Sequence, residues 1–230
     1  MDIDPQVKKR IQYWLEGDFD EKTKCQVLDL LEHDREGLID AFYTTLSFGT
    51  GGLRGIMGPG SNRINIYTVA WATQGLINYL KKQFSEKNGL RVAIGYDSRH
   101  QSKEFAHETA RVLAGNGITA LLFPTLCPTP LVSFACRYHH CQAAIMITAS
   151  HNPPTYNGYK VYWSDGAQVL PPHDRAIIEE VNLVQDLESV HVADPTDPLI
   201  VAITKEVDEA YLDAISRLQL WPLEKEHRQL

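Results

Sequence analysis

Residues 143–154 read Ala-Ala-Ile-Met-Ile-Thr-Ala-Ser-His-Asn-Pro-Pro, an apolar run followed at once by polar and turn-forming residues. The apolar run 143–148 predicts a central strand buried on both faces, as is typical of parallel sheets. Ligands of doubly wound sheets bind at the carboxyl ends of the strands, where this loop falls. Ser150 is therefore a candidate oxygen nucleophile or phosphate carrier, with Thr148 as the other hydroxyl at this strand end.

The residues around Ser150 favour an anion site over a hydrolase site. No Gly-x-Ser-x-Gly elbow is present. His151 follows Ser150 directly, and adjacent side chains on an extended loop should diverge rather than hydrogen-bond. The segment Asn157-Gly-Tyr-Lys160 returns a lysine toward the same end of the sheet. A serine, a histidine and a lysine around one loop describe an oxyanion or phosphate site, with a plain polar turn as the alternative.

A second strand end carries polar residues of the same kind. Residues 95–102 read Gly-Tyr-Asp-Ser-Arg-His-Gln-Ser after the apolar strand predicted at 91–96. Ser102 is a natural N-cap for the helix that follows, and Asp97 can close the turn. We expect Asp97 and Arg99 to support the site by bracing the Ser150 loop through charged hydrogen bonds.

The glycine-rich segment 48–60 reads Phe-Gly-Thr-Gly-Gly-Leu-Arg-Gly-Ile-Met-Gly-Pro-Gly. A dinucleotide fingerprint needs glycine where Arg54 stands, and a P-loop needs lysine where Ser61 stands, so neither motif fits. What remains is a flexible backbone that can approach an anion closely, with one arginine suited to grip a phosphate with two N–H groups. A glycine-rich turn with a surface arginine is an equal alternative.

The rest of the chain predicts an α/β fold. Residues 1–45 read as a helical leader that packs on the following domain, with Asp4 and Asp20 as N-caps. Beyond them strands and helices alternate, which implies a three-layer α/β/α domain at 46–220 with a mostly parallel mixed sheet. Residues 185–203 look like an edge strand or a connecting segment. We expect strands at 91–96, 119–123, 143–148 and 159–163, and helices at 68–84, 102–114, 129–138, 174–184 and around Val207, Tyr211, Ile215 and Leu218.

Composition excludes several classes of protein. The 230 residues carry 22 Lys+Arg against 29 Asp+Glu, a net charge of −7, so a nucleic-acid partner is not expected. No apolar run is long enough to span a bilayer, and the N-terminus is no secretory signal, so we expect no membrane association and a cytoplasmic location. The spacing of Cys136, His139, His140 and Cys141 matches no standard zinc site. We expect buried thiols beside a surface histidine pair.

Four segments together resemble the α-D-phosphohexomutase superfamily, which includes phosphoglucomutase, phosphomannomutase and phosphoglucosamine mutase. The resemblance covers roughly residues 46–220, and its most specific part is the Ser-His-Asn-Pro loop. The segments occur in the family's order: Gly49-Thr-Gly-Gly-Leu-Arg-Gly55, Gly95-Tyr-Asp-Ser-Arg99, Thr148-Ala-Ser-His-Asn-Pro153 and Asn157-Gly-Tyr-Lys160.

The resemblance implies a phosphoprotein in which Ser150 donates a phosphoryl group to a sugar and takes it back from a bisphosphorylated intermediate. The phosphate on Ser150 would also be a ligand of Mg²⁺, and glucose 1,6-bisphosphate would be the activator. The resemblance assigns catalysis to Ser150, His151, Arg54 and Lys160, and substrate phosphate binding to Gly52, Arg54, Asn152 and Lys160. Phosphoryl transfer needs such positive groups around a spreading negative charge.

The chain also departs from the family. Members have four domains, of which the second carries an Asp-Gly-Asp-x-Asp-Arg metal loop that does not occur here. We therefore expect the first domain alone, with residues 221–230 as the start of a linker to an absent second domain and the remaining domains as partners. The implied enzyme is an isomerase that exchanges hexose 1-phosphate and 6-phosphate, glucose first and mannose second, while the isolated fragment should be inactive. The alternative is a non-catalytic phosphate-binding or interaction domain of the same fold.

Overall fold

A computed structural model describes residues 3–49, 51–184 and 186–220, so the predicted linker at 221–230 lies outside the described residues. The centre of the structure is a sheet with the strand order β1-β5-β4-β2-β3-β6. Its strands are β1 (Gly52–Ile56), β2 (Arg91–Tyr96), β3 (Thr119–Leu122), β4 (Ala143–Ile147), β5 (Tyr156–Trp163) and β6 (Ile200–Ala202).

The sheet is mixed and mostly parallel, as predicted. Strands β4, β2, β3 and β6 run parallel to one another, whereas β5 is antiparallel to both β4 and β1. Tyr96 pairs with Ile147 where β2 and β4 end. The loops that follow these two strands therefore start side by side at one edge of the sheet.

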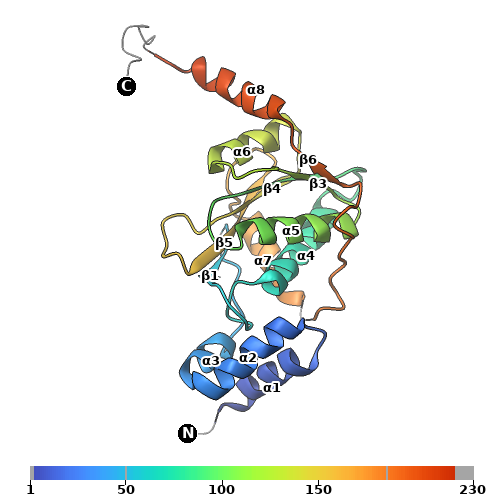
Figure 1. Cartoon of the computed structure of the whole chain (residues 1–230). Helices are drawn as coiled ribbons and strands as arrows, with labels where there is room; N and C mark the ends of the chain where they lie inside the picture. Colours follow the sequence, from blue (N-terminus) through green and yellow to red (C-terminus); the bar gives the residue numbers. More distant parts are fainter. Residues whose placement is uncertain (1–2, 50, 185, 221–230) are drawn as a thin grey trace, which may run out of the picture.

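Helices cover both faces of the sheet and make the predicted three layers (Figure 1). One face carries α4 (Ile66–Gln83), α5 (Ser102–Gly115) and α7 (His173–Leu183); the other carries α6 (Thr129–Tyr138) and α8 (Lys205–Ser216). Strand β2 shows why both layers are needed. Val92 and Ile94 lie in the core cluster beneath α4 and α5, and Ala93 lies in the cluster beneath α6.

The leader forms three helices: α1 (Pro5–Glu16), α2 (Glu21–His33) and α3 (Arg35–Phe42). The side chains of Asp4 and Asp20 accept hydrogen bonds from the first turns of α1 and α2, which confirms the two predicted caps. The leader packs on the first turns of α4, where the Trp14 ring lies 5.6 Å from that of Tyr67 and 6.2 Å from that of Trp71. In Figure 1 it lies at the end of the molecule opposite α8.

Three elements differ from the prediction. Strand β1 forms inside the glycine-rich segment, where only flexible backbone is predicted, because β5 supplies its hydrogen-bond partners. Strand β5 begins at Tyr156 rather than 159 for the same reason. On α8, Val207 is buried and Tyr211 is partly buried, but Ile215 and, beyond the helix end, Leu218 are exposed, so only the first half of the predicted apolar stripe is covered.

Residues 185–203 contain the edge strand β6 near their end, where Ile200 pairs with Ala120. The described part before it is a connecting segment without helix or strand. The segment therefore contains both of the predicted alternatives, a connecting segment followed by an edge strand. Among the described residues, no helix has the length and the apolar character that crossing a bilayer requires.

Candidate active site

The Ser150 loop and the Asp97 loop lie together at the carboxyl ends of β4 and β2. The backbone N–H of Asp97 donates to the carbonyl of Ile147 over 3.2 Å, which ties the two strand ends together. The N–H of Thr148 donates to the carbonyl of Gly158 on β5 over 2.9 Å. The base of the loop is buried at Ala149, and Ser150 at its tip is exposed.

Ser150 has an unusual backbone conformation. Its φ is +58°, in the left-handed region that non-glycine residues seldom occupy. Its N–H donates to Thr148 Oγ1 over 2.9 Å, and the N–H of Asn152 donates to the carbonyl of Ala149 over 3.1 Å. The loop is therefore a tight turn rather than an extended segment, and the expectation that Ser150 and His151 diverge is wrong. Ser150 Oγ lies 3.4 Å from His151 Nδ1.

Arg99 holds the Ser150 loop by its backbone. One guanidinium nitrogen, Nη2, donates to the carbonyls of Ser150, over 2.8 Å, and of Asn152. The other, Nη1, donates to the carbonyls of Pro153, over 2.9 Å, and Tyr156, over 3.0 Å. A planar guanidinium can satisfy several acceptors at once, so one side chain fixes both ends of the turn.

Asp97 anchors Arg99 and the start of α5. Its Oδ1 accepts from the N–H of Arg99 over 3.0 Å and from Ser102 Oγ over 2.8 Å. Its Oδ2 lies 3.6 Å from Arg99 Nε. The predicted N-cap role of Ser102 is wrong, because its hydroxyl is buried and points to Asp97, and Gln101 occupies the N-cap position without a side-chain hydrogen bond.

The buried side chain of Asn157 connects these groups to β5. Its Nδ2 donates to Ser102 Oγ and to the carbonyl of His100, each over 3.0 Å. Its Oδ1 accepts from the N–H of Gly158 over 2.7 Å. Each buried polar atom in this chain of contacts has a partner, which is the condition for a polar network to stabilise a fold.

Strands β1 and β5 place two cations beside the loop. Arg54 pairs with Gly158 and Gly52 with Lys160, so Arg54 and Lys160 lie on the same face of the sheet. Arg54 Nη1 donates to Asn152 Oδ1 over 3.0 Å. Gly52 has a φ of +140°, and a Cβ there would clash with the carbonyl oxygen of Tyr159, so this pairing requires glycine.

The pKa of Lys160 is lowered from the ordinary lysine value. Burial is the largest cause and the charge of Arg54 the second, while the charge of Asp97 acts in the opposite direction. The positive charges of Arg54 and Lys160 are therefore close enough to repel each other. A dianionic phosphate on Ser150 would relieve the repulsion between them.

A pocket of about 330 Å³ opens between the two loops. It is lined by Asp97, Ser98, Arg99, His100, Ser150, Asn152 and Pro154. Ser98, His100 and Pro154 are additional candidates that sequence reasoning left without a role. Their position in the loops that follow two adjacent parallel strands could have identified them from the sequence.

The structure thus brings the predicted site residues together. Arg54 and Arg99 contact the Ser150 loop directly, and Asp97 reaches it through Arg99. Lys160 lies two residues along β5 from Gly158, the pairing partner of Arg54. His151 stands beside Ser150 but does not line the pocket. The roles of these residues in catalysis stay predictions.

Known proteins are similar to this chain in sequence and in fold. The family model for phosphoglucomutase/phosphomannomutase, alpha/beta/alpha domain I, matches residues 45–187. A phosphopentomutase of Homo sapiens is 40% identical over 185 residues, covering 77% of this chain and 30% of that protein. A glucose 1,6-bisphosphate synthase of Mus musculus is 42% identical over 183 residues, with coverage of 76% and 30%.

The chain belongs to the phosphoglucomutase/phosphomannomutase family. Among solved structures, a "putative phosphomannomutase" from Thermus thermophilus superposes with a TM-score of 0.62 at 28% identity, covering 76% of this chain and 36% of that one. The chain spans about 30% of the length of the two curated relatives. It is therefore similar to one domain of these longer phosphosugar enzymes.

The described part of this family member does not by itself form a Mg²⁺ site. No group of three or more His, Cys, Asp or Glu side chains that could hold a metal ion occurs among the described residues. Asp97 is the one carboxylate that lines the Ser150 pocket, and its oxygens already accept from Ser102 and Arg99. A hard cation of this kind prefers several free oxygen ligands.

The cysteine cluster lies elsewhere in the domain. Cys136 and Cys141 are buried, and burial raises the pKa of each thiol to about 12. His140 is exposed, but His139, the residue after the end of α6, is half-buried rather than at the surface. The prediction of buried thiols is therefore confirmed, and the prediction of a surface histidine pair holds for His140 alone.

Proposed function

We propose that this chain is the phosphoryl-carrying domain of a phosphosugar mutase and that Ser150 is the carrier. The observation that supports this most is the Ser150 hydroxyl itself. It is exposed at the tip of a turn whose backbone is clamped by Arg99, at the carboxyl ends of β2 and β4, with Arg54 and Lys160 beside it.

In the proposed reaction a hydroxyl of the sugar phosphate attacks the phosphorus of phosphoserine 150. The new O–P bond forms while the bond between phosphorus and Ser150 Oγ breaks, the sugar hydroxyl loses its proton, and Ser150 Oγ takes one up. His151 Nδ1, 3.4 Å from Oγ, is placed to exchange that proton. The reverse step from the bisphosphorylated sugar then restores the phosphoserine and releases the isomer.

Arg54 and Lys160 would stabilise the charge of the transferring group. The transition state of phosphoryl transfer spreads negative charge over three oxygens, so nearby cations stabilise it more than the ground state. Phosphoserine brings about −1.5 to −2 charges to the loop, which these two side chains offset in part. The phosphate on Ser150 would also be a ligand of Mg²⁺.

The substrate we propose is a hexose phosphate, with exchange of glucose 1-phosphate and glucose 6-phosphate first and the mannose phosphates second. Glucose 1,6-bisphosphate would act as the activator because it can leave a phosphoryl group on Ser150. Pentose phosphates are a second candidate, because one relative at 40% identity is named phosphopentomutase. We expect no turnover from residues 1–230 alone, because the Asp-rich metal loop of the family is not in this sequence.

A coupled assay tests the function in the natural polypeptide that carries this chain. Glucose 1-phosphate, mannose 1-phosphate and ribose 1-phosphate are compared in the presence of Mg²⁺ and glucose 1,6-bisphosphate. We expect turnover that Ser150→Ala abolishes and that the exposed control Ser85→Ala leaves intact. Binding of these sugar phosphates without turnover would instead favour the non-catalytic binding domain.

A further inference from the structure

The proposed phosphoryl transfer moves two protons, and only one of them has an assigned partner. His151 Nδ1 lies 3.4 Å from Ser150 Oγ and can exchange the proton of that oxygen. The attacking sugar hydroxyl must also lose a proton. Because the attacking and leaving oxygens lie on opposite sides of the phosphorus, His151 cannot serve both of them. The acceptor of the second proton has to border the space that the sugar occupies.

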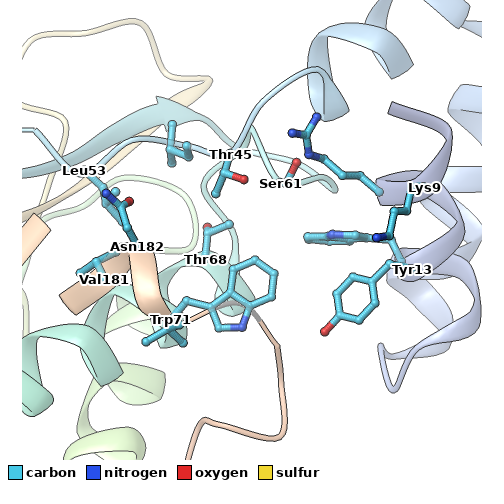
Figure 2. Close-up of a pocket in the computed structure, with 13 residues that line it drawn as sticks. Lys9, Tyr13, Thr45, Leu53, Ser61, Thr68, Trp71, Val181 and Asn182 are labelled. Atoms are coloured by element: carbon cyan, nitrogen blue, oxygen red, sulfur yellow. The ribbon is translucent and has the colours of Figure 1, made fainter. Parts of the chain in front are cut away.

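The pocket of about 330 Å³ beside Ser150 is the space available to the sugar. Its volume lies in the range of small-molecule sites. A larger pocket, of about 460 Å³, lies between the leader and the α/β domain (Figure 2). It shares no lining residue with the Ser150 pocket, and its described lining includes no Asp, Glu or His. The proton acceptor therefore belongs to the Ser150 pocket.

Both cations of the site border this pocket. Asn152 lines it, and Asn152 Oδ1 accepts from Arg54 Nη1 over 3.0 Å. Asp97 also lines it. Burial and then the charge of Arg54 lower the pKa of Lys160, while the charge of Asp97 opposes them, so Lys160 is near both side chains. A phosphoryl group on Ser150 can therefore lie between these cations and a sugar in the pocket.

Most polar side chains that line the pocket cannot take the proton. The carboxylate of Asp97 is occupied, because Oδ1 accepts from the N–H of Arg99 over 3.0 Å and from Ser102 Oγ over 2.8 Å, and Oδ2 lies 3.6 Å from Arg99 Nε. The guanidinium of Arg99 has donors only. The hydroxyl of Ser98 and the amide of Asn152 are not of the kinds that serve as general bases.

His100 differs from these residues. It lines the pocket and is exposed, and no described residue forms a hydrogen bond or an ion pair with its imidazole. Its backbone carbonyl accepts from the buried Nδ2 of Asn157 over 3.0 Å, which holds the backbone that carries the ring. A neutral imidazole has one nitrogen that accepts a proton, and histidine is the side chain that general base catalysis uses most often.

We propose that His100 is the general base for the sugar hydroxyl, an inference that rests on the proposed function. In the first step the hydroxyl oxygen bonds to the phosphorus of phosphoserine 150 and gives its proton to His100. The bond between phosphorus and Ser150 Oγ breaks, and protonated His151 gives its proton to Oγ. In the second step Oγ attacks the other phosphate of the bisphosphorylated sugar and returns its proton to His151. His100 then protonates the sugar oxygen that leaves, so both histidines end as they began.

Chemical rescue in the natural polypeptide that carries this chain tests this role, with glucose 1-phosphate, Mg²⁺ and glucose 1,6-bisphosphate present. We expect His100→Ala to lower kcat about a hundredfold with little change in KM. Free imidazole should restore part of the lost rate, because the variant leaves room for it in an open pocket. His100→Gln fills that room without a basic nitrogen, so it should be as slow and should not be rescued. His107→Ala, which removes an exposed histidine on α5, should keep the wild-type rate.

The outcomes separate this role from the proposed function. A wild-type polypeptide that turns over none of the sugar phosphates would overturn the proposed function and the role of His100 with it. Wild-type turnover with an unchanged kcat in His100→Ala would overturn the role of His100 alone. So would a slow His100→Ala variant that imidazole does not accelerate, because the ring would then only shape the pocket. Both His100 variants should keep the urea midpoint of the unsubstituted chain, since the ring is exposed.

Discussion

Arg99 Nη2 donates a hydrogen bond of 2.8 Å to the backbone carbonyl of Ser150, so an arginine after β2 holds the loop that follows β4. The same guanidinium reaches three further carbonyls of that loop, and its Nε lies 3.6 Å from Asp97. All these contacts are made to backbone or to Asp97. Arg99 therefore leaves the side chains of Ser150 and His151 uncontacted, and Asn152 Oδ1 accepts from Arg54 instead.

Replacing Arg99 by lysine should disorder the Ser150 loop while the fold is kept. Lysine keeps the charge but cannot reach four carbonyls at once. We expect phosphoryl transfer in the natural polypeptide to slow by about tenfold to a hundredfold, because small misplacements of a reacting group cost that much. Steady-state rates measure the effect, with Arg91→Lys at the other end of β2 as control. Equal rates in the two variants would show that the clamp does not position Ser150.

Arg54→Met should slow the reaction without a matching loss of stability. Arg54 is exposed, and its contact is with Asn152. Removing one stabilising group for the transferring charge should lower kcat by about a hundredfold to a thousandfold, while the free energy of unfolding should change by less than about 0.5 kcal/mol. Arg175→Met, which removes an exposed arginine on α7, is the control. An unchanged kcat in Arg54→Met would remove this residue from the mechanism.

Asn157→Ala should destabilise the chain. The side chain is fully buried, and its loss leaves Ser102 Oγ and the N–H of Gly158 with one partner fewer. Such losses lower the free energy of unfolding by about 1–3 kcal/mol. Urea denaturation of the chain measures this against Asn88→Ala, an exposed asparagine before β2. Matching midpoints for both variants would mean that the network does not contribute to stability.

The sequence predicts the layers of the fold because the hydrophobic pattern of each strand or helix indicates which of its faces is buried. It places Ser150 and Asp97 correctly at strand ends for the same reason. It misses β1, because glycines carry no strand signal and only β5 supplies the pairing. The positive φ of Ser150 and the turn of Ser102 toward Asp97 also depend on partners distant in sequence.

The four cysteines should differ in reactivity toward a disulfide reagent. Cys25 is exposed, whereas burial raises the pKa of Cys127, Cys136 and Cys141 from 9.0 to about 12. Because the thiolate is the reactive form, only Cys25 should react quickly in the native chain at mildly alkaline pH. The thiols of the unfolded chain ionise at a lower pH than the buried thiols of the folded chain. The free energy of unfolding should therefore fall as the pH rises above about 9. Rapid native reaction of all four would contradict this burial.

Mass spectrometry of the natural polypeptide tests the central claim, that Ser150 carries the phosphoryl group. The protein is isolated from its own cells, and the phosphate is localised before and after incubation with glucose 1-phosphate. We expect one phosphoryl group on Ser150, lost to the sugar on incubation and restored by glucose 1,6-bisphosphate. A phosphate found on another residue, or a phosphate on Ser150 that no sugar phosphate removes, would contradict the account.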